Sequence, residues 1–240
     1  GEKMSKSRGT GLDPLKYLGL GMNPEWLRYY LATKLSAKNE DIDFNAEDFM
    51  LRVNSDLVGK FVNIASRAAK FLEAGKIAAS LDVNGAHELV ASVKALYETR
   101  EYSKALREVM TFVDKVNAAF DGAAPWKLVK AGQMAEAAAV SSACIQAFKV
   151  ITACLKPVLP ALVREAEVFL QSGDITWGNA ATPFVVGHAI GEYKHLMQRV
   201  DIKQLDALFE ASAVVETAPQ ATLDKASTSA VSIEPLAPEI

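Results

Sequence analysis

The segment between Lys3 and Thr10 has the residue types and spacing that most clearly suggest chemistry. It contains three hydroxyls and three cations, and the cations are Lys3, Lys6 and Arg8. Such a segment can place two ammonium groups and several hydrogen-bond donors around a polyanion. Preorganised groups of this kind stabilise the charge that develops on a pyrophosphate leaving group. Short Lys/Ser runs are also common on solvated surfaces, so chemistry alone leaves both interpretations open.

A second candidate is a polar pair within a long predicted helix. Asn63 and Arg67 are four residues apart and therefore share a helix face. This face is offset from an apolar stripe that includes Phe61, Ile64 and Ala68. An amide beside a guanidinium can read base edges and hold a backbone phosphate. The alternative is a polar helix face without a partner, which is the usual role of such a pair.

The third candidate is Trp126, which follows Ala124 and Pro125. The proline fixes the backbone, so the indole is presented at the start of a helix. An exposed indole there is a stacking platform for a splayed base, although a lone tryptophan is more often a core residue. The other two tryptophans, Trp26 and Trp177, are interpreted as packing residues.

The elements that would position these residues are helices, because apolar residues recur every three and four positions. Asn45 is the expected cap of the longest helix, with Glu47 and Asp48 near the positive end of its dipole. No long alternation typical of strands is present. The predicted fold is therefore all-α, an antiparallel helix bundle preceded by a loop and a short helical segment, and neighbouring helices of the bundle can bring the three candidates together. The predicted helices are 25–35, about 45–75, 86–98, 101–120, 134–155, 160–171 and 201–212, with an irregular segment at 172–190.

Composition divides the chain into three expected parts: a loop with a connecting helical segment at 1–44, a helical domain at 45–212, and a flexible acidic linker at 213–240. The chain is 50% hydrophobic, which excludes a mostly disordered protein. It has 26 basic and 29 acidic residues, a formal net charge of -3. The last part holds four acids and one lysine, which leaves 25 of each elsewhere. Recognition of a nucleic acid would then depend on a few placed groups and not on a basic field.

The two cysteines and three histidines give no sign of a metal site. Cys144 and Cys154 are ten residues apart in an apolar run, a spacing typical of core residues and not of a ligand pair. The histidines lie outside any Cys/His cluster, so no metal ligand is predicted. The longest uncharged apolar run, between Glu136 and Lys149, is too short to cross a bilayer.

Several motifs together resemble a known family. Lys3-Met4-Ser5-Lys6-Ser7 resembles the KMSKS signature of class I aminoacyl-tRNA synthetases. It is followed by Asp13-Pro14, by Leu27-Arg28-Tyr29-Tyr30-Leu31 and by Asp41-Ile42-Asp43-Phe44. This order of motifs is similar to that of bacterial-type methionyl-tRNA synthetases, and the resemblance runs from residue 1 to about 212.

The resemblance implies roles for the candidates. Residues Lys3, Met4, Ser5, Lys6 and Ser7 would bind ATP, which is used with Mg²⁺. Lys3 and Lys6 would stabilise the transition state of methionine activation, with Lys6 the more important. Asn63, Arg67 and Trp126 would bind the anticodon of tRNA(Met). At Gly59, one turn before Asn63, the family often has a polar residue, commonly asparagine. Glycine removes this possible contact, so fewer groups are expected to read the anticodon here.

The resemblance also implies what this sequence does not contain. The family's catalytic domain, with its HIGH motif, and its zinc-bearing insertion precede the KMSKS loop. We interpret the chain as part of a larger enzyme, expect no aminoacylation from it alone, and assign any zinc to the upstream part. The expected partners are tRNA(Met), the catalytic domain and, through a further C-terminal domain, a second copy of the enzyme. DNA and membranes are not expected partners, and the expected location is the cytoplasm.

Two alternatives remain open on the sequence. Synthetases for isoleucine, valine, leucine and cysteine share a KMSKS loop and a helical anticodon domain. A helical interaction module that never contacts RNA would also suit the balanced charge of the body.

Overall fold

The computed structural model describes residues 12–38 and 40–210. The first two helices, α1 (Pro14–Gly19) and α2 (Pro24–Ala32), each begin with a proline after a capping side chain. Asp13 accepts a hydrogen bond from the Leu15 N–H at 2.9 Å, and Asn23 accepts one from the Glu25 N–H at 2.8 Å. These caps satisfy N–H groups that have no partner within a first turn.

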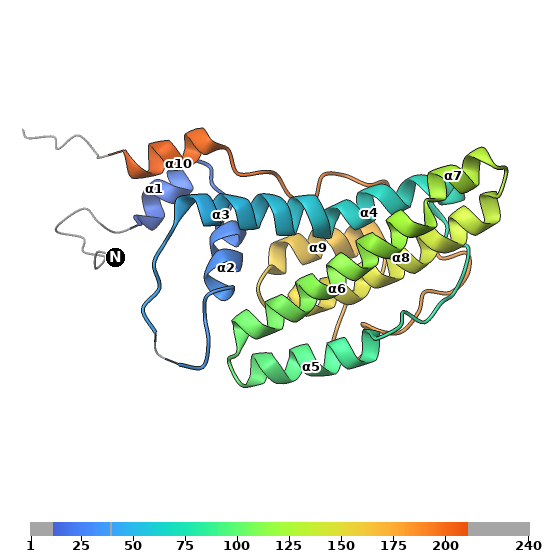
Figure 1. Cartoon of the computed structure of the whole chain (residues 1–240), viewed down its shortest axis with the longest axis horizontal. Helices are drawn as coiled ribbons and strands as arrows, with labels where there is room; N and C mark the ends of the chain where they lie inside the picture. Colours follow the sequence, from blue (N-terminus) through green and yellow to red (C-terminus); the bar gives the residue numbers. More distant parts are fainter. Residues whose placement is uncertain (1–11, 39, 211–240) are drawn as a thin grey trace, which may run out of the picture. The chain divides into compact units, whose positions relative to one another are not determined.

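The long helix predicted over 45–75 is present as a series of segments with different hydrogen bonding (Figure 1). Asn45 caps it, as expected, by accepting from the Asp48 N–H at 2.8 Å. Its middle is a π-helix, which the apolar spacing did not predict. The segments are α3 (Ala46–Arg52), the π-helix η2 (Val53–Phe61), α4 (Val62–Ala68) and the short 3₁₀ turns η3 (Ala69–Phe71) and η4 (Glu73–Gly75).

Six further helices complete the described part of the chain. They are α5 (Ala86–Glu98), α6 (Tyr102–Ala123), α7 (Pro125–Lys130), α8 (Met134–Leu155), α9 (Pro160–Leu170) and α10 (Ile202–Phe209). The predicted bounds of α5 and α8 agree with these, and the segment 172–190 is irregular as predicted. Residues 12–38 and 40–210 form no strand beyond one isolated antiparallel bridge between Lys76 and Ala189. The prediction of an all-α fold is therefore confirmed.

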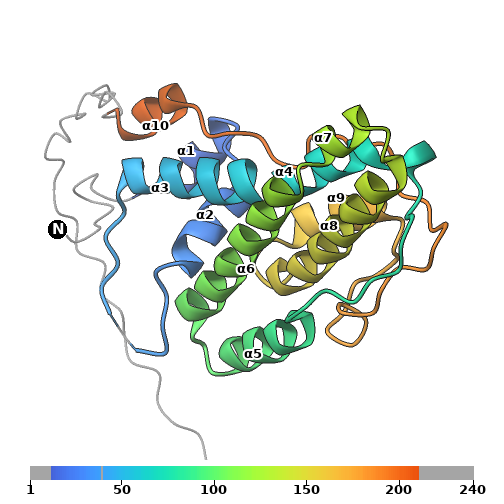
Figure 2. The same ribbon diagram turned by 45° about the vertical axis from the view of Figure 1, so that its right-hand side comes forward.

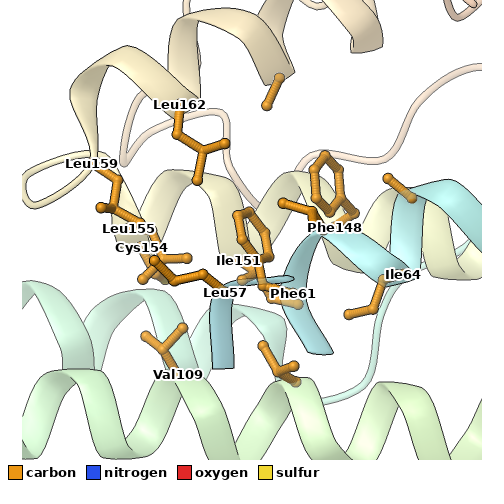
Figure 3. Packing of buried hydrophobic residues seen from close by; sticks show 14 of the residues in the cluster. Leu57, Phe61, Ile64, Val109, Phe148, Ile151, Cys154, Leu155, Leu159 and Leu162 are labelled. Atoms are coloured by element: carbon orange, nitrogen blue, oxygen red, sulfur yellow. The ribbon is translucent and has the colours of Figure 1, made fainter. Parts of the chain in front are cut away.

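Helix α8 lies at the centre of the bundle, in contact with α4, α5, α6, α7 and α9 (Figure 2). Its Phe148 stacks on Phe61 of η2 with ring centroids 4.9 Å apart. Figure 3 shows this core, in which Ile151 and Leu155 of α8 gather with buried side chains of the long helix, α6 and α9. By length and composition α8 could cross a membrane, but 78% of its apolar window is buried inside the fold, as in a core helix.

The segment after α9 returns along the long helix towards α10 (Figure 1). Asn54 of η2 holds it at Val200, donating to the Val200 carbonyl at 3.1 Å and accepting from its N–H at 2.8 Å. The indole N–H of Trp26 donates to the Met197 sulfur at 3.0 Å. Two elements distant in sequence thereby hold the return segment.

Candidate nucleic-acid interface

The structure brings Arg67 and Trp126 together at the junction of α4, α6 and α7. The Arg67 guanidinium carbon lies 4.7 Å from the ring centroid of Phe120 and 5.9 Å from that of Trp126. The two rings are themselves 6.2 Å apart and inclined at 51°. The guanidinium therefore lies over two aromatic faces, an arrangement that favours a cation electrostatically and fixes the plane of its donors.

A sharp change of direction between α6 and α7 places Trp126. Helix α6 ends at Ala123, the following Ala124 has the left-handed backbone conformation with φ +46°, and Pro125 then begins α7. Trp126 therefore lies in the first turn of α7, and 37% of its surface is exposed. Trp26 is buried, and Trp177 packs at 6.2 Å from the Tyr97 ring. Trp126 is the only one of the three tryptophans whose side chain is exposed.

Acidic residues of α6 face basic residues of the long helix. Arg67 donates to a carboxylate oxygen of Asp121, and Lys60 pairs with Asp114 at 2.9 Å. Arg67 is about three-quarters buried, while Asp121 is mostly exposed. A guanidinium carries five N–H donors, so one bond to Asp121 leaves others available to a ligand on the solvent side.

Asn63 lies on α4 one turn before Arg67 and is half-buried. Its side chain makes no hydrogen bond to any residue in the described part of the chain. Its amide can both donate and accept. Asn63 shares its face of α4 with Arg67, and Arg67 lies over Phe120 and Trp126. Asn63, Arg67 and Trp126 are therefore the candidate surface.

Phe120 and Asp121 belong to this arrangement although sequence reasoning missed them. Phe120 is only 4% exposed, and in the sequence it is one more member of the apolar stripe of α6. Asp121 is 54 residues from Arg67, a separation over which no local spacing rule operates. The one usable signal was their closeness in sequence to Pro125 and Trp126.

The remaining groups considered in the sequence are the segment from Lys3 to Ser7, the two cysteines and possible metal ligands. The residues Lys3, Met4, Ser5, Lys6 and Ser7 lie outside the described residues. Burial raises the pKa of Cys144 and of Cys154 to about 12, so both thiols remain protonated as core residues. Within residues 12–38 and 40–210, no three His, Cys, Asp or Glu side chains gather as a metal would require.

Comparison with known proteins adds independent evidence. The family described as "tRNA synthetases class I (M)" matches residues 1–69. The methionine–tRNA ligase of Polaromonas sp. is 57% identical over 231 residues, which is 92% of this chain and 34% of the relative. The methionine–tRNA ligase of Herminiimonas arsenicoxydans is 49% identical over 255 residues, covering all of this chain and 36% of the relative.

Solved structures show the same fold. Mycobacterium tuberculosis methionyl-tRNA synthetase in complex with methionyl-adenylate superposes with a TM-score of 0.73 at 20% identity, over 83% of this chain and 42% of that one. The apo form of the same enzyme gives a TM-score of 0.65 at 16% identity, over 74% and 39% of the two chains. At 16–20% sequence identity the solved structures establish only the fold. The homology is established by the sequence relatives, which are far more similar to this chain. The chain is homologous to the methionine–tRNA ligases and spans about a third of the length of the relatives it matches.

Proposed function

We propose that this chain is the anticodon-binding part of a methionine–tRNA ligase. The observation that carries the proposal is the Arg67 guanidinium placed over Phe120 and Trp126, with Asn63 one turn away. In this scheme one base of the anticodon stacks on Trp126. The amide of Asn63 and the free donors of Arg67 then bind base edges or a phosphate.

The whole enzyme would activate methionine with ATP and Mg²⁺ and transfer it to tRNA(Met). In that reaction the segment Lys3–Ser7 would close over ATP, with Lys3 and Lys6 stabilising the charge on the leaving pyrophosphate. Any zinc belongs to the upstream part. The segment 213–240 would link the helical domain at 45–212 to a further domain through which the enzyme dimerises, and the enzyme would act in the cytoplasm.

Binding of tRNA tests the proposal directly. The 240-residue chain should bind a tRNA(Met) transcript, and its affinity should fall as salt rises from about 50 to 200 mM, since phosphate contacts release counterions. Trp126→Ala should weaken binding by roughly 5- to 100-fold, the range expected for one stacked base. Arg67→Met should weaken it as well and reduce discrimination between anticodons.

Arg164→Met is the matched control, because Arg164 is an exposed arginine of α9. It should leave the discrimination between anticodons unchanged. If the chain does not bind tRNA, or binds it with no dependence on salt or on Trp126, the proposal is wrong. A helical protein-interaction module then becomes the better interpretation.

We further propose that this chain alone does not activate methionine. Class I activation takes place on a nucleotide-binding α/β domain, and residues 12–38 and 40–210 contain no strand from which such a sheet could be built. Methionine-dependent ATP–pyrophosphate exchange by the isolated chain should stay at background. A rate above background that requires methionine would contradict this.

A further inference from the structure

A hollow lies beside α4, next to the surface formed by Asn63, Arg67 and Trp126. It has a volume of about 480 Å³, within the range of small-molecule sites. One wall is the C-terminal end of the long helix and the other is the return segment. The hollow is lined by Ser66, Ala69, Lys70, Ala74, Gly75, Ile190, Gly191, Glu192 and Tyr193.

Helix geometry connects this hollow to the proposed anticodon surface. The four exposed or half-exposed polar residues of α4 and its following turn are Asn63, Ser66, Arg67 and Lys70. At 100° per residue they occupy one arc of about 100°, while Val62, Ile64, Ala65 and Ala68 face the core. Arg67 lies at one edge of this arc, towards Trp126. Ser66 lies at the opposite edge and lines the hollow with Lys70.

The walls of the hollow are held by the fold. Gly75 has φ +66°, and its carbonyl accepts from the Ile190 N–H at 2.8 Å. A Cβ at Gly75 would lie 3.0 Å from the Ile190 carbonyl oxygen, so this close approach favours glycine. The Gly191 N–H donates to the Phe169 carbonyl at 2.7 Å, and the Tyr193 hydroxyl donates to the Val62 carbonyl at 3.3 Å. A ligand would therefore enter a preformed site.

The lining suits a nucleotide. Ala69, Ile190 and the Tyr193 ring supply apolar surface for a base, and the Ser66 hydroxyl can donate to or accept from a base edge. Lys70 is exposed, and neither Ser66 nor Lys70 has a hydrogen-bond or ion-pair partner among the described residues. The carboxylate of Glu192 at the rim repels a phosphate, which directs the backbone of the ligand towards Lys70.

We propose that the hollow is a second nucleotide subsite, which takes the nucleotide adjacent in the RNA strand to the base stacked on Trp126. This inference rests on the proposed function and adds a specific pocket to it. A strand that crosses the arc from Trp126 past Arg67 and Asn63 meets Ser66 and Lys70 next. Recognition would then extend over two neighbouring nucleotides, one on each side of α4.

Abasic RNA tests this subsite. The probe is an anticodon stem-loop RNA with the CAU anticodon and three derivatives, in which the base of one anticodon position is removed. The 240-residue chain should bind the intact RNA about tenfold more tightly than the derivative that leaves the hollow empty. Ser66→Leu fills the hollow, so it should weaken binding of intact RNA about tenfold and leave that derivative unaffected.

Two further comparisons separate the subsite from general effects. Ser92→Leu fills a different hollow, between α5 and α6, and should change no affinity. Lys70→Gln should lower the slope of log affinity against log salt by about 1, whereas Lys115→Gln, at that second hollow, should not. Circular dichroism and thermal unfolding of each variant exclude loss of the fold as the cause.

The outcomes are distinguishable. If abasic effects depend on Trp126 but none depends on Ser66, the anticodon proposal stands and the second subsite is wrong. If Ser66→Leu weakens all four RNAs equally, the hollow does not hold a base, and the subsite is again wrong. If the wild-type chain binds none of the RNAs, the subsite and the proposed function are both wrong.

Discussion

At the scale of single residues, the central feature is a guanidinium held between ring faces and a carboxylate. Phe120 is almost fully buried, so it gives Arg67 a fixed surface to lie on. Asp121 is mostly exposed, and an ion pair in that setting contributes only about 0–1 kcal/mol. If Arg67 contacts RNA as proposed, a phosphate would replace Asp121 at little cost, while Phe120 would keep the plane of the guanidinium.

Phe120→Leu should weaken RNA binding through Arg67. Leucine retains an apolar core contact but removes the ring face under the guanidinium, so the affinity should fall by roughly fivefold, as expected for about 1 kcal/mol of cation–π contact. In an Arg67→Met background the same substitution should have no further effect on affinity. A double-mutant cycle on tRNA binding measures this coupling.

Phe112→Leu is the matched control, because Phe112 is also a buried phenylalanine of α6, without a contact to Arg67. Both leucine variants should lose about 1 kcal/mol of stability from the smaller side chain. Only Phe120→Leu should alter RNA binding. Two results would mean that Phe120 has only a packing role. One is that Phe120→Leu and Phe112→Leu lose RNA affinity equally, and the other is that Phe120→Leu loses as much affinity in the Arg67→Met background as in the wild type.

At the scale of elements, the π-helix η2 determines how the polar arc of α4 is presented. A π-helix advances with more residues per turn than an α-helix, so it changes the angular relation between α3 and α4. Within it, Asn54 binds Val200 and Lys60 pairs with Asp114. Gly59 also lies here, and a Cβ at this position would approach the Asn54 carbonyl oxygen to 3.2 Å. Glycine therefore avoids crowding at this position.

Elements whose signals are local could be predicted from the sequence. The caps Asp13, Asn23 and Asn45 act within three residues, and the bounds of α5 and α8 follow from apolar spacing and composition. The π-helix could not be predicted, because its apolar residues keep a spacing of three and four. That Asn63 and Arg67 share a face is likewise a local property.

Contacts between elements that are distant in the sequence could be identified only from the structure. Glu25 is 4% exposed, and its carboxylate accepts from the N–H groups of Ala161 and Leu162 in the first turn of α9, at 2.5 and 2.8 Å. In the sequence it only appears as an acid in the first turn of its own helix. The pairing of Arg67 with Phe120 and Asp121 is of the same kind. Such contacts depend on how the helices pack, which no single-helix pattern encodes.

At the scale of the whole molecule, two polar residues of the core helix hold the irregular segment after α9. Lys149 donates to the Thr182 carbonyl at 2.9 Å and lies 4.7 Å from the centroid of the Phe184 ring. Gln146 donates to the same carbonyl at 3.1 Å and accepts from the Phe184 N–H at 2.8 Å. The segment continues to Ile190, which forms a wall of the hollow beside α4. Hydrogen bonds from the core helix α8 therefore hold the same segment of chain that, further along, forms one wall of the hollow.

Burial of Lys149 makes stability depend on pH, because it lowers the pKa of this amine below its usual 10.5. Between the lowered pKa and about 10.5 the unfolded chain binds more protons at this lysine than the folded chain does. The free energy of unfolding should therefore rise with pH in this window, by at most about 1.4 kcal/mol per pH unit. The rise ends once the unfolded lysine has also lost its proton.

Lys149→Met isolates this contribution. The variant loses the bond to Thr182 but also the buried charge, so its stability relative to wild type should be highest near neutral pH and decline as pH rises. Other buried groups, such as Cys154, titrate in both proteins and cancel in the difference. Urea unfolding at several pH values from about 7 to 10 measures it, with the exposed Lys203→Met as the control that should run parallel to wild type. If the difference in the free energy of unfolding between Lys149→Met and wild type is constant over this range, titration of Lys149 does not contribute to the pH dependence of stability. The amine then keeps its charge in the folded state throughout.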